Sequence, residues 1–317
     1  MITSDLSQHG LIAITGDDAQ AFLHTQLTSD VNALALNRSQ YSGYCTPKGR
    51  LLASFLLWRS EQGYFIQLPA VLREAIQKRL SMYILRSKAK ARDASAEFVR
   101  FGIAGADAAA KLQPLFGEVP RAAHEATHRD GVAILRLPVD RFEVVVPNEK
   151  AAAIRESLAA NAESSGPEYW DWLDIRAGVP VITPATQEEF VPQMVNFDAI
   201  GAVSFNKGCY PGQEIVARMH YLGRLKQRMF LVNIAASVAP QPGDKLYSAA
   251  MGEQASGMIV NAAASPEGGY DALAAIQLRS VSVGAGDIHW KSSDGPALKF
   301  LPLPYKVGAP SSPEQVR

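Results

Sequence analysis

Hydrophobic residues recur along this chain with two different periods, which separate expected helices from expected strands. A helical period spaces four apolar residues after position 70, namely Leu72, Ile76, Leu80 and Tyr83. By contrast, the runs LLASFLLW (51–58) and YFIQL (64–68) are short, apolar and flanked by turn residues, as buried strands are. The region between 51 and 83 therefore predicts a strand hairpin followed by a helix.

The first two thirds of the chain repeat this alternation. Further strands are expected at 11–14, 41–45, 98–104, 132–137 and 142–146. Further helices are expected directly after Gly16, at 106–116, at 149–161, and from Ser165 to a stop at Gly178 and Pro180. Strands and helices that alternate with hairpins between them favour an α+β fold over a parallel doubly wound sheet.

After about residue 226 the helix signals vanish. Short strand candidates separated by Pro-Gly, Gly-Gly and Asp-Gly turns follow at 229–234, 245–248, 255–260, 270–278 and 297–303. We therefore predict an α+β region over 1–225, a C-terminal β-barrel over 226–308 and a disordered tail over 309–317.

Composition places the chain among folded soluble proteins, with 47% hydrophobic and 20% charged residues in 317. Lys plus Arg (31) equals Asp plus Glu (31), so no global field attracts nucleic acid or membrane. No apolar run approaches the roughly 20 residues of a membrane span. The start, MITSDLSQHG, lacks the basic and apolar regions of a signal peptide, so a cytoplasmic location without membrane contact is expected.

Two cysteines, Cys45 and Cys209, are too few for a disulfide framework and are expected to be reduced. Cys209 stands in NKGCYPGQEIVAR (206–218), where Pro211 predicts the first turn of a helix. A thiol at or just before a helix N-terminus, next to Lys207, is favoured as thiolate. Two interpretations stay open from these residues: an inert packed cysteine, or a nucleophile, cluster ligand or redox sensor.

The string HEATH (124–128) formally matches the zinc-peptidase pattern HExxH, which needs a helix to bring both histidines to one metal. Here Asp130 and Gly131 signal a hairpin turn, and the strand at 132–137 follows. Residues four apart on a strand are separated by about 13 Å. A solvated hairpin without metal is therefore predicted.

A basic segment runs from Arg73 to Arg92 and holds one acid, Glu74. Its seven cations are Arg73, Lys78, Arg79, Arg86, Lys88, Lys90 and Arg92. This helix face and the strand after it suit RNA phosphates or an acidic protein, although a solvated surface explains the charges equally well. Near the end of the α+β region, Tyr169, Trp170 and Trp172 are either core residues or a platform for a flat heteroaromatic ligand.

The octapeptide KGCYPGQE resembles the signature of the YgfZ family, folate-binding relatives of the glycine-cleavage T-protein (aminomethyltransferase) that include iron–sulfur cluster assembly factors. The family form is Lys-Gly-Cys-aromatic-x-Gly-Gln-Glu, and seven residues fit it: Lys207, Gly208, Cys209, Tyr210, Gly212, Gln213 and Glu214. Further segments agree in order, namely LIAITG (11–16), FLHTQLTSDV (22–31), CTPKGRLLASF (45–55), LDIRAGVPVI (173–182) and LPLPY (301–305). The resemblance implies ferredoxin-like α+β domains around a central folate-binding opening, two such units being interleaved within 1–225 with the second inserted at 49–118.

The resemblance also implies a site. Cys209 matches the cysteine that the family requires, Trp170 matches a folate-contacting tryptophan, and His9 stands where a second such tryptophan falls. Tetrahydrofolate has a flat ring with donors and acceptors and a negatively charged glutamate tail. Further candidate contacts for it are Tyr210, Gln26, Asp30, Asn196 and Gln213, with Arg218 or Arg224 for the tail.

Three functions follow from these observations. The leading hypothesis is a tetrahydrofolate-binding protein that supports assembly, maintenance or repair of iron–sulfur enzymes, including tRNA-thiolating ones, which would be its partners. The alternative is a folate-dependent aminomethyl or one-carbon transferase, against which Arg176 counts because the transferases carry an acid in that segment. The third is a non-enzymatic RNA or protein adaptor that uses the basic segment.

Overall fold

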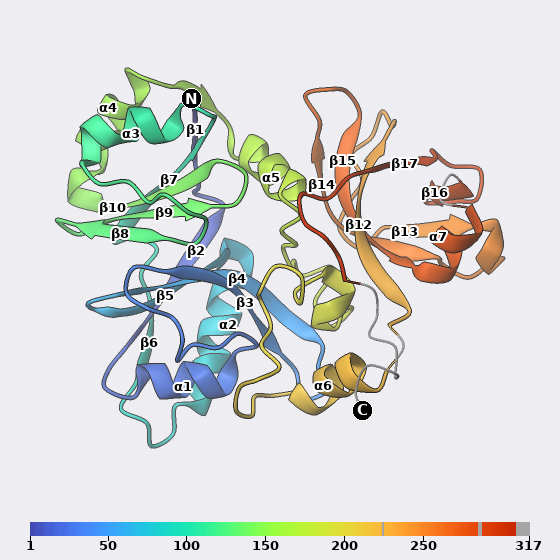
Figure 1. Cartoon of the computed structure of the whole chain (residues 1–317), viewed down its shortest axis with the longest axis horizontal. Coiled ribbons are helices and arrows are strands. Elements are labelled where there is room, and N and C mark those ends of the chain that lie inside the picture. The colour runs from blue at the N-terminus through green and yellow to red at the C-terminus, as the bar shows by residue number, and fades with distance from the viewer. Residues whose placement is uncertain (224, 285–286, 309–317) are drawn as a thin grey trace. The chain divides into compact units, whose positions relative to one another are not determined.

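The computed structural model describes residues 1–223, 225–284 and 287–308 (Figure 1). Two compact units divide the chain: one comprises 1–25, 30–41 and 55–170, and the other comprises 26–29, 42–54 and the chain from residue 171 onward. The domain bounds predicted from the sequence, 1–225 and 226–308, stay a prediction beside this division. The tail predicted at 309–317 lies outside the described residues, as does Arg224.

A six-stranded sheet lies in the first unit, in the order β11–β1–β7–β10–β9–β8. Its neighbouring strands are antiparallel except β1 and β11, which are parallel. The strands span Ile2–Asp5 (β1), Phe98–Ala104 (β7), Ala126–Arg129 (β8), Val132–Leu137 (β9), Arg141–Pro147 (β10) and Glu163–Ser165 (β11). Two helices belong to the same unit, Ala108–Phe116 (α3) and Ala151–Ala159 (α4), the latter preceded by a 3-10 turn at Asn148–Lys150.

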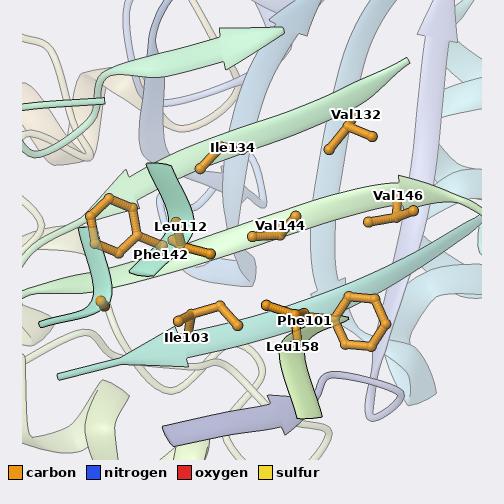
Figure 2. Close-up of a cluster of buried hydrophobic side chains, with 10 residues drawn as sticks. Phe101, Ile103, Leu112, Val132, Ile134, Phe142, Val144, Val146 and Leu158 are labelled. Atoms are coloured by element: carbon orange, nitrogen blue, oxygen red, sulfur yellow. The ribbon is translucent and has the colours of Figure 1, made fainter. Parts of the chain in front are cut away.

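The core of this unit forms because alternate strand residues point to one side of the sheet (Figure 2). Ten side chains make it: Phe101 and Ile103 of β7, Val132 and Ile134 of β9, Phe142, Val144 and Val146 of β10, Ala108 and Leu112 of α3, and Leu158 of α4. The strand residues between them, among them Arg100, Gly102 and Glu143, consequently belong to the opposite face of the sheet.

A five-stranded antiparallel sheet has the order β3–β4–β5–β2–β6. Its strands span His9–Thr15 (β2), Ser39–Cys45 (β3), Leu51–Ser60 (β4), Gly63–Pro69 (β5) and Lys90–Asp93 (β6). Helix α2 (Ala70–Tyr83) packs on β2, β5 and β6 and buries Leu72, Ile76 and Leu80, while α1 (Ala19–Gln26) follows β2. Within the first unit, Gln67 of β5 donates a hydrogen bond to the buried carboxylate of Glu143, which ties this sheet to β10.

The second unit contains an antiparallel sheet in the order β16–β13–β14–β15–β12–β17. Its strands span Gln227–Ile234 (β12), Lys245–Ser248 (β13), Gly257–Ala264 (β14), Tyr270–Gln277 (β15), Ile288–Trp290 (β16) and Leu298–Leu301 (β17). An isolated bridge between His289 and Ala297 joins the region of its two edge strands, so the sheet curves into a half-barrel. The remaining helices are Pro167–Arg176 (α5), Gln213–Tyr221 (α6) and Leu278–Gly284 (α7), with 3-10 turns at Pro192–Val195 (η2) and Ala249–Met251.

The predicted α+β fold is confirmed, and the region predicted as a C-terminal β-barrel is an antiparallel half-barrel sheet. Three predicted details are wrong. The helix expected from Ser165 begins at Pro167, because Ser165 is the last residue of β11 and pairs with Ser4. The C-terminal region is not free of helix, since α7 follows β15, and its buried Ser280 accepts a hydrogen bond from Ser248. The third, the start of α6, concerns the site itself.

Candidate functional site

The loop 205–212, which carries the Cys209 motif, is held in the second unit by the side chain of Lys207. Its ammonium donates hydrogen bonds to the carbonyl oxygens of Leu27 (2.6 Å) and Ser29 (2.9 Å). The amide of Gln213 in turn donates to the carbonyl oxygen of Lys207 at 3.2 Å. The motif lysine and glutamine thus fix the backbone on both sides of the cysteine.

Tyr210 anchors the loop 205–212 through its buried side chain. Its side chain is buried, the Lys207 ammonium lies 5.1 Å from its ring centre, and its hydroxyl has no hydrogen-bond partner among the described residues. Burial raises the pKa of the Tyr210 hydroxyl, with a smaller contribution from the nearby Cys45. Cys45 is itself fully buried, and burial raises the pKa of its thiol. Tyr210 and Cys45 therefore form part of the core beneath the loop.

Gly212 closes the loop and sets the start of α6. Its φ of 82° is left-handed, and a Cβ at this position would lie 2.4 Å from the Thr46 carbonyl oxygen and 2.5 Å from the Gly49 Cα. The helix consequently begins at Gln213, with Gly212 as its N-cap. The prediction that Pro211 opens the helix is wrong. Gly212 lies in close contact with the turn at Thr46–Gly49 and has a left-handed conformation, which a right-handed helix cannot include.

Cys209 is exposed at the tip of this loop. It lies three residues before the N-cap Gly212, outside the first turn in which a helix end stabilises an anion. The neighbouring Gly208 and Glu214 are also exposed. Of the two cysteines, Cys209 is the one that a solute can reach.

An aromatic cluster beside the motif has no counterpart in the sequence analysis. Phe205 stacks on His220 with ring centres 3.7 Å apart, and Tyr221 meets both rings edge-on. Tyr221 is 45% exposed, so this cluster offers an aromatic surface at the end of α6. This cluster could not be predicted from the sequence, because Phe205 and His220 are 15 residues apart and neither the helical nor the strand period relates them.

Trp170 and the backbone of His9, the candidates of the first unit, both contact residues of β7. The guanidinium of Arg100 donates to the His9 carbonyl oxygen at 2.6 Å. Two residues on, Gly102 leaves the space that the Trp170 ring fills, and a Cβ there would lie 2.4 Å from the ring. Trp170 is 2% exposed, and the Arg141 guanidinium lies 5.2 Å from its ring centre.

The remaining candidates lie in different surroundings. Asn196 is fully buried, and its amide both donates to and accepts from the backbone of Met229 (2.8 and 3.4 Å). Gln26 is half-buried at the end of α1, and Arg218 is exposed on α6. Arg176 contacts the carboxylate of the buried Asp271 at 3.5 Å, so this charge is used inside the second unit.

The hairpin predicted at HEATH is confirmed, with its first strand beginning at Ala126, after His124 and Glu125. Ala126–Arg129 forms β8, and Asp130 and Gly131, both with positive φ, turn it into β9. His124 contacts the ring of Tyr41 edge-on, whereas Nε2 of His128 lies 3.0 Å from the Leu36 carbonyl oxygen. The two histidines thus serve separate contacts.

The basic segment is confirmed as a helix and a strand. Arg73 pairs with Asp93 at 3.2 Å and Arg92 pairs with Glu97. Four further cations are exposed and make no ion pair among the described residues: Lys78, Arg86, Lys88 and Lys90. Exposed apolar side chains stand among them, namely Met82, Tyr83 and Leu85.

None of the described helices has the length and apolar content that crossing a membrane requires.

Comparison with known proteins assigns the chain to a family. The model of the GCVT N-terminal domain matches residues 1–169. The tRNA-modifying protein YgfZ of Sodalis glossinidius is 33% identical over 96% of this chain and 92% of its own length, and that of Yersinia pestis is 34% identical over 76% and 73%. The aminomethyltransferase T of the glycine cleavage system from Bartonella henselae superposes with a TM-score of 0.78 at 17% identity, over 96% of this chain and 85% of that one, and so shares the fold. With a match to the GCVT N-terminal domain and a relative that aligns along nearly its whole length, the chain belongs to the YgfZ family of tRNA-modifying proteins.

Proposed function

We propose that this chain binds tetrahydrofolate and supports the assembly, maintenance or repair of iron–sulfur enzymes, including enzymes that thiolate tRNA, with Cys209 as its reactive thiol. The observation that carries the proposal is that Lys207, Tyr210 and Gly212 hold the loop 205–212 while Cys209 stays exposed. An exposed thiol on a fixed backbone is accessible to a sulfur atom, a metal cluster or an electrophile of a client enzyme. Membership of a family of tRNA-modifying proteins agrees with that role.

The folate part of the proposal is supported by the first unit. A pterin ring needs an aromatic or apolar surface with polar groups beside it. The Trp170 ring packs on the face of β7 that also carries Arg100, and Arg100 donates a hydrogen bond to the backbone of His9. In the second unit Tyr210, Gln26 and Arg218 remain candidates. Asn196 is left out, because its amide is satisfied by Met229.

Calorimetric titration with tetrahydrofolate tests this part. We expect saturable binding that His9→Ala and Trp170→Phe each weaken several-fold, whereas Arg121→Gln, which changes an exposed cation of the same unit, leaves the affinity unchanged. Absence of any binding heat at millimolar folate would contradict it.

The thiol role is tested in cells that lack their own family member. Cys209→Ser is expected to abolish the rescue of iron–sulfur enzyme activity and of tRNA thiolation, and Cys45→Ala is the control because that thiol is buried. Full rescue by Cys209→Ser, at equal protein level, would remove Cys209 from the mechanism.

The alternative is an aminomethyl or one-carbon transferase. It shares the folate requirement but predicts turnover, so conversion of tetrahydrofolate to its methylene form in the presence of an aminomethyl donor distinguishes it. Arg176, paired with Asp271, supplies no acid in its segment, and we therefore place this function second.

A second candidate role, contact with tRNA, is favoured by the exposed cations of the basic segment. Four unpaired cations around the exposed Tyr83 would neutralise phosphates while the ring stacks on a base. In fluorescence anisotropy with tRNA, Arg86→Glu with Lys88→Glu is expected to lower the affinity about tenfold. Lys245→Glu with Lys299→Glu, an equal charge change on the other unit, is the control; equal losses in both variants would reduce the effect to net charge.

A further inference from the structure

A cavity of about 360 Å³ lies within the first unit, beside the carboxyl end of β1 and the start of β2. Three arginines line it, Arg73, Arg100 and Arg155, together with two aspartates, Asp5 and Asp93. Its volume is in the range of small-molecule sites, roughly 300–1,000 Å³. The balance of these five charges determines the charge of a ligand that the cavity can bind.

Two of the arginines are neutralised by the two aspartates. Arg73 lies 3.2 Å from the Asp93 carboxylate, and Arg155 lies 2.8 Å from that of Asp5. Arg100 has no carboxylate within ion-pair distance among the described residues. The carboxylates of Glu143, Asp5 and Asp93 stabilise the charge of Arg100 from a longer distance, so its charge is partly compensated while two of its donors are not satisfied.

Arg100 is also the most deeply buried of the three, with 5% of its surface exposed. Its Nη2 donates to the His9 carbonyl oxygen, whereas Nε and Nη1 are buried without a hydrogen-bond partner among the described residues. A guanidinium has no neutral form at ordinary pH, so it cannot escape this environment by losing its proton. Burying a charge and two donors without partners is costly, and a native structure rarely leaves such groups without a ligand or ordered water.

We propose that this cavity binds an oxyanion, the carboxylate or phosphate group of a small molecule, with Arg100 as its buried donor. Such a group supplies the missing acceptors for Nε and Nη1, in charge-assisted hydrogen bonds that are about twice as strong as neutral ones. Arg73 and Arg155 line the same cavity, but their ion pairs with Asp93 and Asp5 leave Arg100 as the main donor for the anion. The site stands independently of the proposed folate role, although a folate carboxylate is one source of such a group.

The test is calorimetry of the full chain with three probes at constant ionic strength: sodium phosphate, sodium acetate and tetrahydrofolate. Saturable binding of phosphate or acetate by the wild type, weakened at least tenfold in Arg100→Met and about threefold in Arg155→Gln, is expected. Arg121→Gln, an exposed cation outside the cavity, should bind as the wild type does. Because all variants are measured in the same buffers, general salt effects cancel.

Two arms keep the result interpretable. If Arg100→Met fails to fold, Arg100→Lys keeps the charge but loses the planar set of donors, and its affinity is still expected to fall at least tenfold. Competition between tetrahydrofolate and phosphate would identify the folate carboxylate as the source, and independent binding would identify a free oxyanion. Wild-type protein that binds neither phosphate nor acetate, or equal affinities in wild type and Arg100→Met, would overturn the proposal, whereas failure of folate binding alone would bear on the proposed function only.

Discussion

Gly212 lies so close to Gly49 that a Cβ at position 212 would be 2.5 Å from the Gly49 Cα. Gly212→Ala therefore combines a left-handed backbone with a steric overlap that backbone atoms must relieve. We expect a loss of about 3 kcal/mol or more in the free energy of unfolding, measured by urea titration.

Gly201→Ala is the matched control for this change. Gly201 has a similar φ of 71°, but a Cβ there meets nothing within 4 Å, so the expected loss is about 1 kcal/mol. Equal losses for the two alanine variants would show that the contact with the 46–49 turn contributes nothing.

The ammonium of Lys207 satisfies two carbonyl oxygens, those of Leu27 and Ser29. Lys207→Met keeps the length of the side chain and removes both hydrogen bonds, which should cost about 2 kcal/mol in the free energy of unfolding. Lys245→Met, at an exposed lysine of the same unit, should cost almost nothing. A Lys207→Met variant as stable as the control would mean that the lysine does not hold the loop.

The two thiols should differ strongly in their reaction with iodoacetamide. Cys209 is exposed, whereas Cys45 is buried and its burial raises the thiol pKa, which removes the reactive thiolate. Native protein is expected to take up one label, at Cys209, and a second only in denaturant, as mass spectrometry of the peptides can verify. Labelling of Cys45 at the same rate in native protein would contradict the burial described above.

His124 makes stability depend on pH. Burial, with smaller contributions from Arg38 and Arg141, lowers the pKa of its imidazole from the ordinary value of 6.5 to about 4. The unfolded chain therefore binds a proton that the folded chain refuses between pH 6.5 and 4, and stability falls as pH falls through this range. The loss is complete below pH 4 and amounts to about 3 kcal/mol.

His124→Asn separates this effect from the carboxylates that titrate below pH 5. Asparagine tolerates the positive φ of 66° at this position and does not titrate. Between pH 7 and 5 the free energy of unfolding should fall more steeply for the wild type than for the variant. Parallel curves would assign the dependence to other groups.

The elements that the sequence predicted well are those in which one period extends over a long segment. The strand at 98–104 and the helix with Leu72, Ile76 and Leu80 agree with β7 and α2: Phe101 and Ile103 pack on one side of the strand, and the three helix residues are buried. The short edge strand β11 (ESS) was missed, since three polar residues carry no periodic signal and are fixed by pairing with β1.

For the site, the sequence indicated the motif around Cys209 but not the structural role of each motif residue. The local pattern around Pro211 predicted a helix start, and a contact with a turn more than 160 residues earlier moved it to Gln213. The unpaired donors of Arg100 could not be predicted from the sequence either. The single arginine in FVRFGIA gives no indication that its side chain is buried on one face of β7.

The Trp170 ring occupies the space that a side chain at position 102 would need, and this has an evolutionary consequence. A larger residue at 102 has no room while the indole is present, and a smaller residue at 170 leaves a void that glycine cannot fill. The two positions should therefore change together among relatives, and a chain that replaces its tryptophan by a small side chain is expected to have lost its glycine as well.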